Sequence, residues 1–312
     1  MHDIAIILPA FNEELTIGDT IEDFYNELPN SHFVVIDNGS TDGTNLAARS
    51  TISRLGLSGE VFLELRRGKA MAVRTAFSLV DAQIYVLVDA DLTYPASDVH
   101  SLISPIVDGN ADMVVGDRIS TGAYKRENSR SFHSLGNAFV RKLINSLFNS
   151  NLNDILSGYR AFTRKFVKGY PILVRGFELE TDLTVHALDK RFRIIEVDVN
   201  YRDRPRDSFS KLNTYSDGFR VIKMVVNIFR YYRPLAFFGW LGFTSAIFSI
   251  VSAIKPISDW LETRYVEHVP LALLSVGFGL TSALCFVCGL ILDALARQNR
   301  FNYEISLNND VR

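Results

Sequence analysis

Short hydrophobic runs and longer amphipathic segments alternate along the first part of the chain. The apolar runs read as buried strands at residues 4–8, 33–36, 61–65, 84–88 and 113–115. Between the first runs, residues 14–28, 44–54 and 69–80 place apolar side chains at helical spacing. Such alternation is typical of βαβ units. The pattern therefore predicts an α/β fold with a mainly parallel sheet and helices on both faces.

Polar residues gather where the predicted strands end. Ligands of open α/β sheets bind beyond the carboxyl ends of the strands. We therefore expect these polar residues to share one site. The pairs are Asn12 and Glu13, Asp37 and Asn38, Asp89 and Asp91, and Asp117 and Arg118.

Two later segments combine an apolar helical face with basic residues. They are Ser131–Phe148 and Asp217–Tyr232. Basic amphipathic helices can lie in a membrane interface, but they can also pack on a sheet. For the first segment both interpretations stay open. The second leads through Pro234 into a long apolar run, which favours the interface.

Two runs near the C-terminus carry no charged side chain. Leu235–Ile254 and Val269–Leu292 are each long enough to cross a hydrocarbon core of roughly 30 Å as a helix. The alternative is a pair of buried helices in a soluble protein, but two such runs in tandem favour a transmembrane hairpin. The chain then divides into a sheet domain at 1–212, an interface helix at 213–234, two transmembrane helices at 235–292 and a tail at 293–312.

Positive charge flanks the two apolar runs on the side of the sheet domain and the tail. Positive flanks stay in the cytoplasm, so we expect the sheet domain and the tail there and the connecting loop outside. The flanking residues are Arg220, Lys223, Arg230 and Arg233 before the first run and Arg297 and Arg300 after the second, whereas the loop sets Lys255 and Arg264 against Asp259, Glu262 and Glu267.

Composition narrows the function further. A formal net charge of -2 gives no basic field for nucleic acid. The only cysteines, Cys285 and Cys288, lie inside the second apolar run, where packing is a better interpretation than a metal site or a disulfide. The first apolar run, at residues 4–8, is too short for a secretory signal.

Asp89 and Asp91 stand one residue apart where a predicted strand ends. Two carboxylates so placed can share a divalent cation such as Mg²⁺ or Mn²⁺ through oxygen ligands. That cation would bridge a diphosphate and offset charge on a departing nucleotide. Alone the pattern is weak, because two aspartates can also cap a loop.

Six motifs in sequence order make the chain resemble family 2 glycosyltransferases. It is most similar to the branch of dolichyl-phosphate mannose synthases and bacterial polyprenyl-phosphate glycosyltransferases, many of which also end in membrane helices. The resemblance implies a GT-A fold. The motifs are Leu8-Pro-Ala-Phe-Asn-Glu13, Val35-Ile-Asp-Asn-Gly-Ser-Thr-Asp-Gly-Thr44, Arg67-Gly-Lys69, Asp89-Ala-Asp-Leu92, Asp154-Ile-Leu-Ser-Gly-Tyr-Arg160 and Ser210-Lys-Leu-Asn213.

The resemblance also implies a binding site for a nucleotide diphosphate sugar. Asp37 would lie under the base and ribose, and Asn38 stands where the family usually has a second Asp. An amide offers both a donor and an acceptor, so base recognition survives with altered preference. The residues carried over are Pro9, Ala10, Asn12 and Glu13 for the nucleoside, Asp37 and Asn38 for the base and ribose, Lys69 for the phosphates, Asp89, Ala90 and Asp91 for the nucleotide and metal, and Arg204 and Lys211 for the diphosphate.

A lipid phosphate as acceptor changes what catalysis requires. A phosphate monoester has a second pKa of about 6, so it is mostly dianionic at neutral pH and needs positioning more than a base. Arg118 and Arg130 are the predicted ligands of the acceptor phosphate. Asp154 and Glu180 occupy positions that match acidic residues of the family, and each is either a site residue or a capping or solvated acid.

The sequence therefore predicts an inverting transferase that moves a hexose, from UDP-glucose or UDP-N-acetylglucosamine, to a polyprenyl phosphate. A GDP-mannose-dependent enzyme is the alternative, and an inactive membrane scaffold is the second. A processive synthase is disfavoured because no QxxRW motif occurs. We expect a multi-pass membrane protein whose catalytic domain faces the cytoplasm. The oligomeric state is open, and a homo-oligomer is compatible with the sequence.

Overall fold

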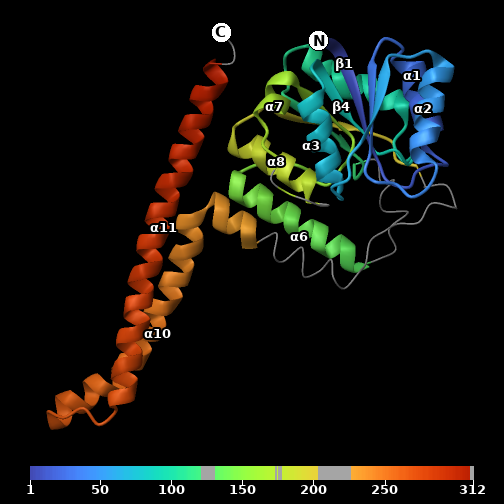
Figure 1. Cartoon of the computed structure of the whole chain (residues 1–312). Helices are drawn as coiled ribbons and strands as arrows, with labels where there is room; N and C mark the ends of the chain where they lie inside the picture. The colour runs from blue at the N-terminus through green and yellow to red at the C-terminus, as the bar shows by residue number, and fades with distance from the viewer. Residues whose placement is uncertain (121–130, 173, 175–177, 203–225, 310–312) are drawn as a thin grey trace. The chain divides into compact units, whose positions relative to one another are not determined.

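The computed structural model describes residues 1–120, 131–172, 174, 178–202 and 226–309 (Figure 1). The chain divides into two compact units, Met1–Val221 and Ile222–Arg312. The first contains the sheet and the second contains the long apolar helices. Each unit is described by itself.

The first unit is built on a sheet in the order β3-β2-β1-β4-β6-β5-β7. All strand pairs are parallel except those of β6, which runs antiparallel to both β4 and β5. This confirms the predicted mainly parallel sheet. Neither β6 nor β7 was among the predicted strands. The strands are β1 (His2–Ala10), β2 (His32–Asp37), β3 (Gly59–Leu63), β4 (Ala82–Leu87), β5 (Met113–Asp117), β6 (Arg160–Thr163) and β7 (Ile194–Asp198).

Helices cover both faces of this sheet, as predicted. One face of the sheet is covered by α1 (Ile17–Glu27), α2 (Thr44–Leu55) and α4 (Val99–Val107). A short 3-10 turn, η1 (Ala96–Asp98), comes directly before α4. On the other face α3 (Lys69–Leu79) packs beside α7 (Arg164–Gly169). Among the described residues of this unit, the other helices are α6 (Ser131–Phe148), which matches its predicted bounds, and α8 (Leu179–Asp189).

Two predicted boundaries are shifted by local hydrogen bonding. Strand β3 covers Gly59–Leu63 rather than 61–65, because its register pairs Gly59 with Phe33 and Leu63 with Asp37, where β2 ends. Helix α1 begins at Ile17 rather than at residue 14, because the backbone N–H groups of Thr16 and Ile17 close a turn on the carbonyl of Glu13.

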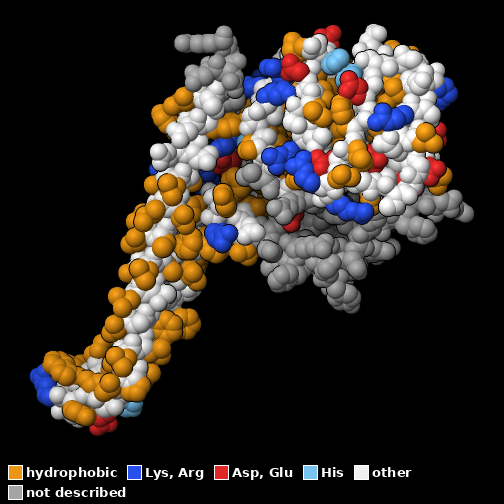
Figure 2. All heavy atoms as spheres, viewed as in Figure 1, with side chains coloured by type: hydrophobic (Ala, Val, Ile, Leu, Met, Phe, Trp, Pro, Cys, Tyr) orange, Lys and Arg blue, Asp and Glu red, His pale blue; other side chains and the backbone are white. Residues whose placement is uncertain are grey.

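The second unit is a helical hairpin of α10 (Pro234–Thr263) and α11 (Val269–Asn309). Only 11% and 17% of the most apolar windows of these helices are buried, whereas a core helix would be mostly buried. Figure 2 shows hydrophobic side chains gathered along their surface. The helices contact each other through small residues, since Ser245 and Ser249 donate to carbonyls of α11 at 2.8 Å. Both helices are long and apolar enough to cross a membrane.

Both helices extend beyond the apolar runs that predicted them. Helix α10 continues through Thr263, so the connection is residues 264–268 rather than the whole segment after Ile254. Helix α11 continues through Asn309, where a tail was predicted from residue 293. Ion pairs at i, i+4 spacing, Lys255 with Asp259 and Asp293 with Arg297, support these polar extensions. Of the predicted interface helix, residues 226–232 are described and are helical.

Candidate active site

Hydrogen bonds join the loops that follow β1 and β2. The backbone N–H of Asn12 donates to Ser40 Oγ at 3.0 Å, and its side-chain Oδ1 accepts from the N–H of Thr41 at 2.8 Å. The N–H of Glu13 donates to Thr44 Oγ1 at 2.8 Å. Asn12 takes a left-handed conformation with φ of 53°, which asparagine tolerates better than most residues. The two loops therefore form one rigid wall at the carboxyl ends of the strands.

The end of β1 and the end of β2 form the rest of that wall. Pro9 and Ala10 are the last two residues of β1, and the carbonyl of Ala10 accepts from the N–H of Asn38 at 2.8 Å. Asp37 is buried, and its carboxylate accepts from the N–H of Ser40 at 2.8 Å and from Asn45 Nδ2 at 3.1 Å. This wall thus groups the residues predicted to bind the nucleoside.

The Asn38 amide holds the loop between β3 and α3. Its Nδ2 donates to the carbonyls of Glu64 and Arg66, at 3.0 and 2.7 Å, and its Oδ1 accepts from the N–H of Gly68 at 2.7 Å. Both N–H groups of this amide are therefore in use. Contact with a nucleotide base stays a prediction, whereas the role in shaping the loop is visible in the structure.

Glu64 strengthens the same loop. Its carboxylate accepts from the backbone N–H of Arg66 at 2.7 Å, from the Arg66 guanidinium at 2.5 Å and from Thr75 Oγ1 at 2.5 Å. These bonds, chiefly the one from the Arg66 side chain, lower the pKa of Glu64 to about 2. The guanidinium of Arg67 lies 5.0 Å from the centre of the Phe11 ring. We call residues 10–16, 38–44, 64–69 and 89–91 the donor side of the site, after the nucleotide sugar that the sequence predicts there.

Lys69, at the start of α3, lies between two carboxylates. Its Nζ donates to Asp89 Oδ1 and, at 2.7 Å, to Glu180 Oε1. Burial favours the neutral amine, but Asp89 and Glu180 outweigh burial and raise the pKa of Lys69. Lys69 is therefore charged at neutral pH. Helix α8 supplies Glu180 from its first turn, while the neighbouring Asp182 bonds to the hydroxyl of Tyr170.

Asp89, Ala90 and Asp91 follow β4, as the strand pattern predicted. The carbonyl of Ala90 accepts from Thr16 Oγ1 at 2.7 Å, and Asp91 Oδ1 accepts from Thr93 Oγ1 at 2.6 Å. The first bond fixes the backbone between the two aspartates, and the second orients the Asp91 carboxylate. Among the described residues no group of three or more His, Cys, Asp or Glu side chains could hold a metal ion. Two carboxylates with diphosphate and water oxygens are nonetheless a normal ligand set for Mg²⁺.

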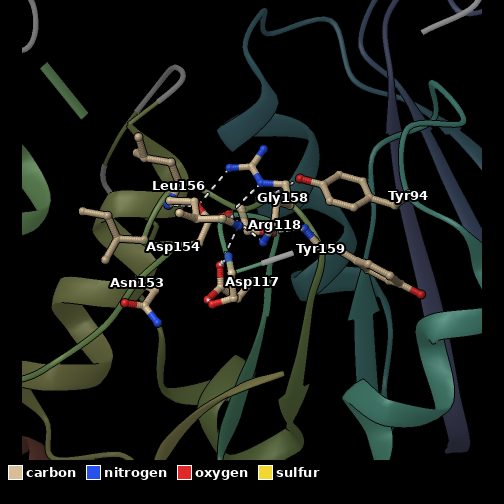
Figure 3. Close-up of polar contacts among 12 residues, drawn as sticks. Tyr94, Asp117, Arg118, Asn153, Asp154, Leu156, Gly158 and Tyr159 are labelled. Carbon is tan, nitrogen blue, oxygen red and sulfur yellow. Dashed lines mark hydrogen bonds and ion pairs between the residues drawn. The ribbon is translucent and has the colours of Figure 1, made fainter. Parts of the chain in front are cut away.

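Arg118 and Asp154 form a buried ion pair (Figure 3). Arg118 donates from Nε to Asp154 Oδ2 at 2.7 Å and from Nη2 to Oδ1 at 2.9 Å. Its guanidinium also lies 6.0 and 5.4 Å from the ring centres of Tyr94 and Tyr201. Burial favours the neutral form, but the surrounding groups, Asp154 among them, hold the pKa of Arg118 well above its usual value. The nearby Asp117 accepts from the N–H of Ile119 at 2.7 Å.

A second buried arginine fixes the segment after Asp154. Arg160 is 0% exposed and donates to the carbonyls of Ser157 and Ile155, at 2.8 and 2.7 Å, and to Thr184 Oγ1 at 2.9 Å. Burial lowers the pKa of Arg160. No described carboxylate forms an ion pair with it. We call residues 117–118 and 154–160 the acceptor side of the site.

The structure brings most predicted site residues to one edge of the sheet. Lys69, Asp89 and Glu180 meet there, and Arg118 meets Asp154. The remaining predicted residues Arg130, Arg204 and Lys211 lie outside the described part of the chain. Sequence reasoning missed the contacts of Thr16, Tyr94 and Gly158. The Ser157-Gly158 step within the family-like motif was the one available signal for the last of these.

The chain is similar to several proteins that are named as glycosyltransferases or sugar transferases. Glycosyltransferase AglJ of Haloferax volcanii is 29% identical over 301 residues, which cover 95% of both chains. Dolichyl-phosphate hexose transferase of the same organism is 27% identical over 226 residues, 72% of this chain and 93% of that protein. A crystal structure of glucosyl-3-phosphoglycerate synthase from Mycobacterium tuberculosis, in complex with Mn²⁺ and uridine-diphosphate-glucose, matches with a TM-score of 0.54. It is 22% identical and covers 73% of this chain and 78% of that chain.

The fold and the site thus define a sugar-transferring α/β enzyme with a GT-A-like sheet. The family described as Glycosyl transferase family 2 matches residues 5–170. Because this match spans more than half of the chain, the protein belongs to glycosyltransferase family 2.

Proposed function

We propose that this chain transfers a hexose from a UDP-sugar, UDP-glucose or UDP-N-acetylglucosamine, to a polyprenyl phosphate with inversion at the anomeric carbon. The proposal rests on one observation, which is that the same chain contains a glycosyltransferase family 2 domain and two exposed apolar helices. Similarity to a dolichyl-phosphate hexose transferase supports the lipid phosphate as acceptor. The fold shared with a synthase solved with UDP-glucose supports a nucleotide sugar as donor.

The donor nucleotide binds, in this proposal, against the joined loops after β1 and β2. Asn12, Glu13 and Asp37 line that wall, and their bonds to neighbouring loops hold it in place before the donor arrives. A preformed wall lowers the entropy that binding would otherwise lose. Lys69 places a buried positive charge at the start of α3, where a diphosphate would gain from it.

Asp89 and Asp91 would hold a divalent cation, Mg²⁺ or Mn²⁺, together with the donor diphosphate. The donor set fits, because hard cations take oxygen ligands and keep part of their shell from phosphate and water. Once bound, the cation offsets negative charge on the departing nucleotide. Thr93 holds the Asp91 carboxylate, and Thr16 holds the backbone of Ala90 between the two aspartates.

The acceptor phosphate meets the acceptor side, with Arg118 and Arg130 as its proposed ligands. Arg118 is buried against Asp154 through two hydrogen bonds, so Asp154 acts as a positioning residue for it rather than as a free base. Glu180 acts in the same way on Lys69. A dianionic phosphate attacks without losing a proton, which agrees with carboxylates that are occupied by cationic partners.

The hairpin anchors the enzyme at the membrane that contains its lipid acceptor. We propose that α10 and α11 both span it and that the sheet unit and the end of α11 face the cytoplasm. The charge distribution supports this orientation. Arg230 and Arg233 precede the first apolar run and Arg297 and Arg300 follow the second, whereas the segment between the runs sets Lys255 and Arg264 against Asp259, Glu262 and Glu267.

Activity is tested with the full chain in lipid vesicles that contain polyprenyl phosphate. A panel of radiolabelled UDP-glucose, UDP-N-acetylglucosamine and GDP-mannose, each with Mg²⁺ or Mn²⁺, should yield one labelled lipid phosphate from a UDP-sugar. Asp89→Asn and Asp91→Asn should each lower turnover by about 100-fold or more, since a metal–carboxylate contact contributes several kcal/mol. Anomeric proton coupling in the product should show a β linkage from an α-linked donor.

Four results would contradict parts of this proposal. Transfer from GDP-mannose alone would show that the donor is not a UDP-sugar. A polymer product would show that the acceptor is not a lipid phosphate that receives one sugar. Full turnover after treatment with EDTA would show that transfer needs no metal, and an α-linked product would show that the reaction does not invert the anomeric carbon.

The acceptor role is examined at Arg130, because Arg130→Glu should weaken use of lipid phosphate more than donor binding. Equal loss of donor affinity in calorimetry would move this residue to the donor side.

Orientation is tested by labelling single cysteines in a variant whose Cys285 and Cys288 are replaced by alanine. A cysteine at Glu262, near the end of α10, should react with an impermeant maleimide added outside intact cells. A cysteine at Asn308 should react only after the cells are opened. The reverse pattern would overturn the orientation.

A further inference from the structure

Gly158 lies where the donor and acceptor sides meet. Its backbone N–H donates to the hydroxyl of Tyr94 at 3.0 Å (Figure 3). A methyl carbon on Gly158 would stand 2.6 Å from Asp89 Oδ2 and 3.0 Å from Lys69 Nζ. These separations are well inside the contact distance of carbon with oxygen or nitrogen. The missing side chain is therefore what lets the Asp89 carboxylate lie against the backbone of the acceptor side.

Space, not backbone conformation, demands a glycine here. In the described part of the chain, the glycines with a left-handed φ are Gly39, Gly56, Gly68 and Gly109, and Gly158 is not among them. Alanine at this position would meet no backbone strain of the kind that favours glycine. Its whole effect would come from the contact between the new methyl group and its neighbours.

The segment that carries Gly158 is held on both sides. Arg160 binds the carbonyls of Ile155 and Ser157, and Arg118 binds the carboxylate of Asp154. Asp89, in contrast, is a short side chain that is 28% exposed and follows the end of β4. If a methyl group is added at position 158, the Asp89 carboxylate is the part that can move.

We propose that Gly158 is a positioning residue for Asp89, so that the acceptor-side segment fixes the orientation of the donor-side carboxylate through direct contact. Bulk at position 158 turns Asp89 away from its place beside Lys69. The inference rests on the proposed function in one respect, which is that Asp89 holds the divalent cation of the donor diphosphate. It adds that the donor's metal site depends on a backbone position in the acceptor-side motif.

The first measurement is Mn²⁺ affinity in the presence of UDP, from the paramagnetic resonance signal of free Mn²⁺. Gly158→Ala should bind Mn²⁺ about 10- to 100-fold more weakly, the range found when a residue that orients a metal ligand is changed. Gly136→Ala is the matched control, because a methyl group at this position in α6 meets nothing within 4 Å. Its affinity should equal that of the wild type.

The second measurement asks whether the effect passes through Asp89. In an Asp89→Ala background the methyl group at position 158 no longer meets the Asp89 carboxylate and faces only the flexible end of the Lys69 side chain, so Gly158→Ala should weaken UDP binding no further. Any fall in Tm caused by Gly158→Ala should also be restored by Asp89→Ala. Such coupling between two changes is what a double-mutant cycle isolates. Equal losses of UDP affinity in both backgrounds would overturn the inference.

The two variants also separate this inference from the proposed function. If Asp89→Ala loses Mn²⁺ but Gly158→Ala binds it like the wild type, the positioning role is wrong and the metal role stands. If Asp89→Ala keeps wild-type Mn²⁺ affinity, the metal role fails. In that case restoration of Tm in the double variant still supports the contact between the two residues, and its absence overturns it.

Discussion

On the donor side of the site, loops after three neighbouring strands are joined mainly by neutral hydrogen bonds, whereas on the acceptor side the segment 154–160 is held by buried guanidinium groups. Asn38 and Thr44 represent the first arrangement. Arg118 and Arg160 represent the second. A neutral hydrogen bond contributes about 1 kcal/mol, but one partner removed from a buried ion pair leaves an uncompensated charge.

This difference matches what each side has to bind in the proposed reaction. A nucleoside needs fixed donors and acceptors, which hydrogen-bonded loops provide. A lipid phosphate needs positive charge kept in one place, and a carboxylate partner keeps a buried arginine charged and oriented. The two sides should therefore respond very differently when one contact is removed.

Stability of the sheet unit has to be followed by a probe that sees it. The two tryptophans, Trp240 and Trp260, both lie in α10, so tryptophan fluorescence reports on the hairpin alone. Hydrogen exchange of individual peptides reports on each side of the site separately. Hydrogen exchange is therefore the measurement for substitutions on both sides of the site.

The largest effect should come from the acceptor side. Arg118→Met leaves Asp154 buried without its cation and should lower the free energy of unfolding by about 3–5 kcal/mol. Arg164→Met is the matched control, because its ion pair with Asp81 is exposed at the surface, with side chains 45% and 46% exposed. That variant should lose at most about 1 kcal/mol. Similar losses in the two variants would remove the contrast between buried and exposed pairs.

A smaller loss should follow on the donor side from Asn38→Asp. The carboxylate would lose both donated hydrogen bonds and face the carbonyls of Glu64 and Arg66. We expect a cost of about 2–3 kcal/mol and faster exchange in residues 64–72. Asn110→Asp, at an exposed position, provides the control for the added charge. Protection of the loop at wild-type level in Asn38→Asp would show that the amide does not hold it.

Thr44→Val should have a more modest effect. The hydroxyl of buried Thr44 accepts from the backbone N–H of Glu13, and valine keeps its shape without that acceptor. The unpaired N–H should cost about 1–2 kcal/mol and loosen the β1–α1 loop. Thr41→Val, at an exposed position in the same loop system, should change exchange in that loop much less. Equal changes in both variants would mean that the buried bond is not what joins the loops.

The smallest effect is a dependence on acidity. Glu64 has a pKa of about 2 in the fold, below its usual value near 4.5. Its contribution is therefore complete above about pH 4.5 and is lost as the pH falls toward 2. Because the partner Arg66 is exposed, solvent screening keeps the size of this contribution on the order of 1 kcal/mol. Glu64→Gln should flatten this part of the acid titration of stability, and Glu60→Gln, which is exposed, should leave it unchanged. An identical acid profile in wild type and Glu64→Gln would contradict the assignment.

The pattern of apolar and polar positions was enough to predict the class of fold and the edge of the sheet where polar residues gather. Strands with continuous apolar runs alternate with helices of amphipathic spacing, and that alternation has one common solution, a mainly parallel sheet. Because parallel strands end at the same edge, Asp37, Asp89 and Asp117 could be expected along one edge of the sheet. The two apolar helices could also be predicted from the sequence, because their length and lack of charge are local properties.

The partners of Lys69 and Arg118 depend on long-range packing and became known only from the folded structure. The pairing of Lys69 with Glu180, and of Arg118 with Asp154, joins positions far apart in the chain, and nothing in the local pattern fixes such distances. The antiparallel insertion of β6 between β4 and β5 follows from the same long-range packing. It carries the 154–160 segment to the site and sets Gly158 against Asp89. A glycine that is required for lack of space, rather than for its φ, leaves no mark on local propensity and becomes visible only when its neighbours are in place.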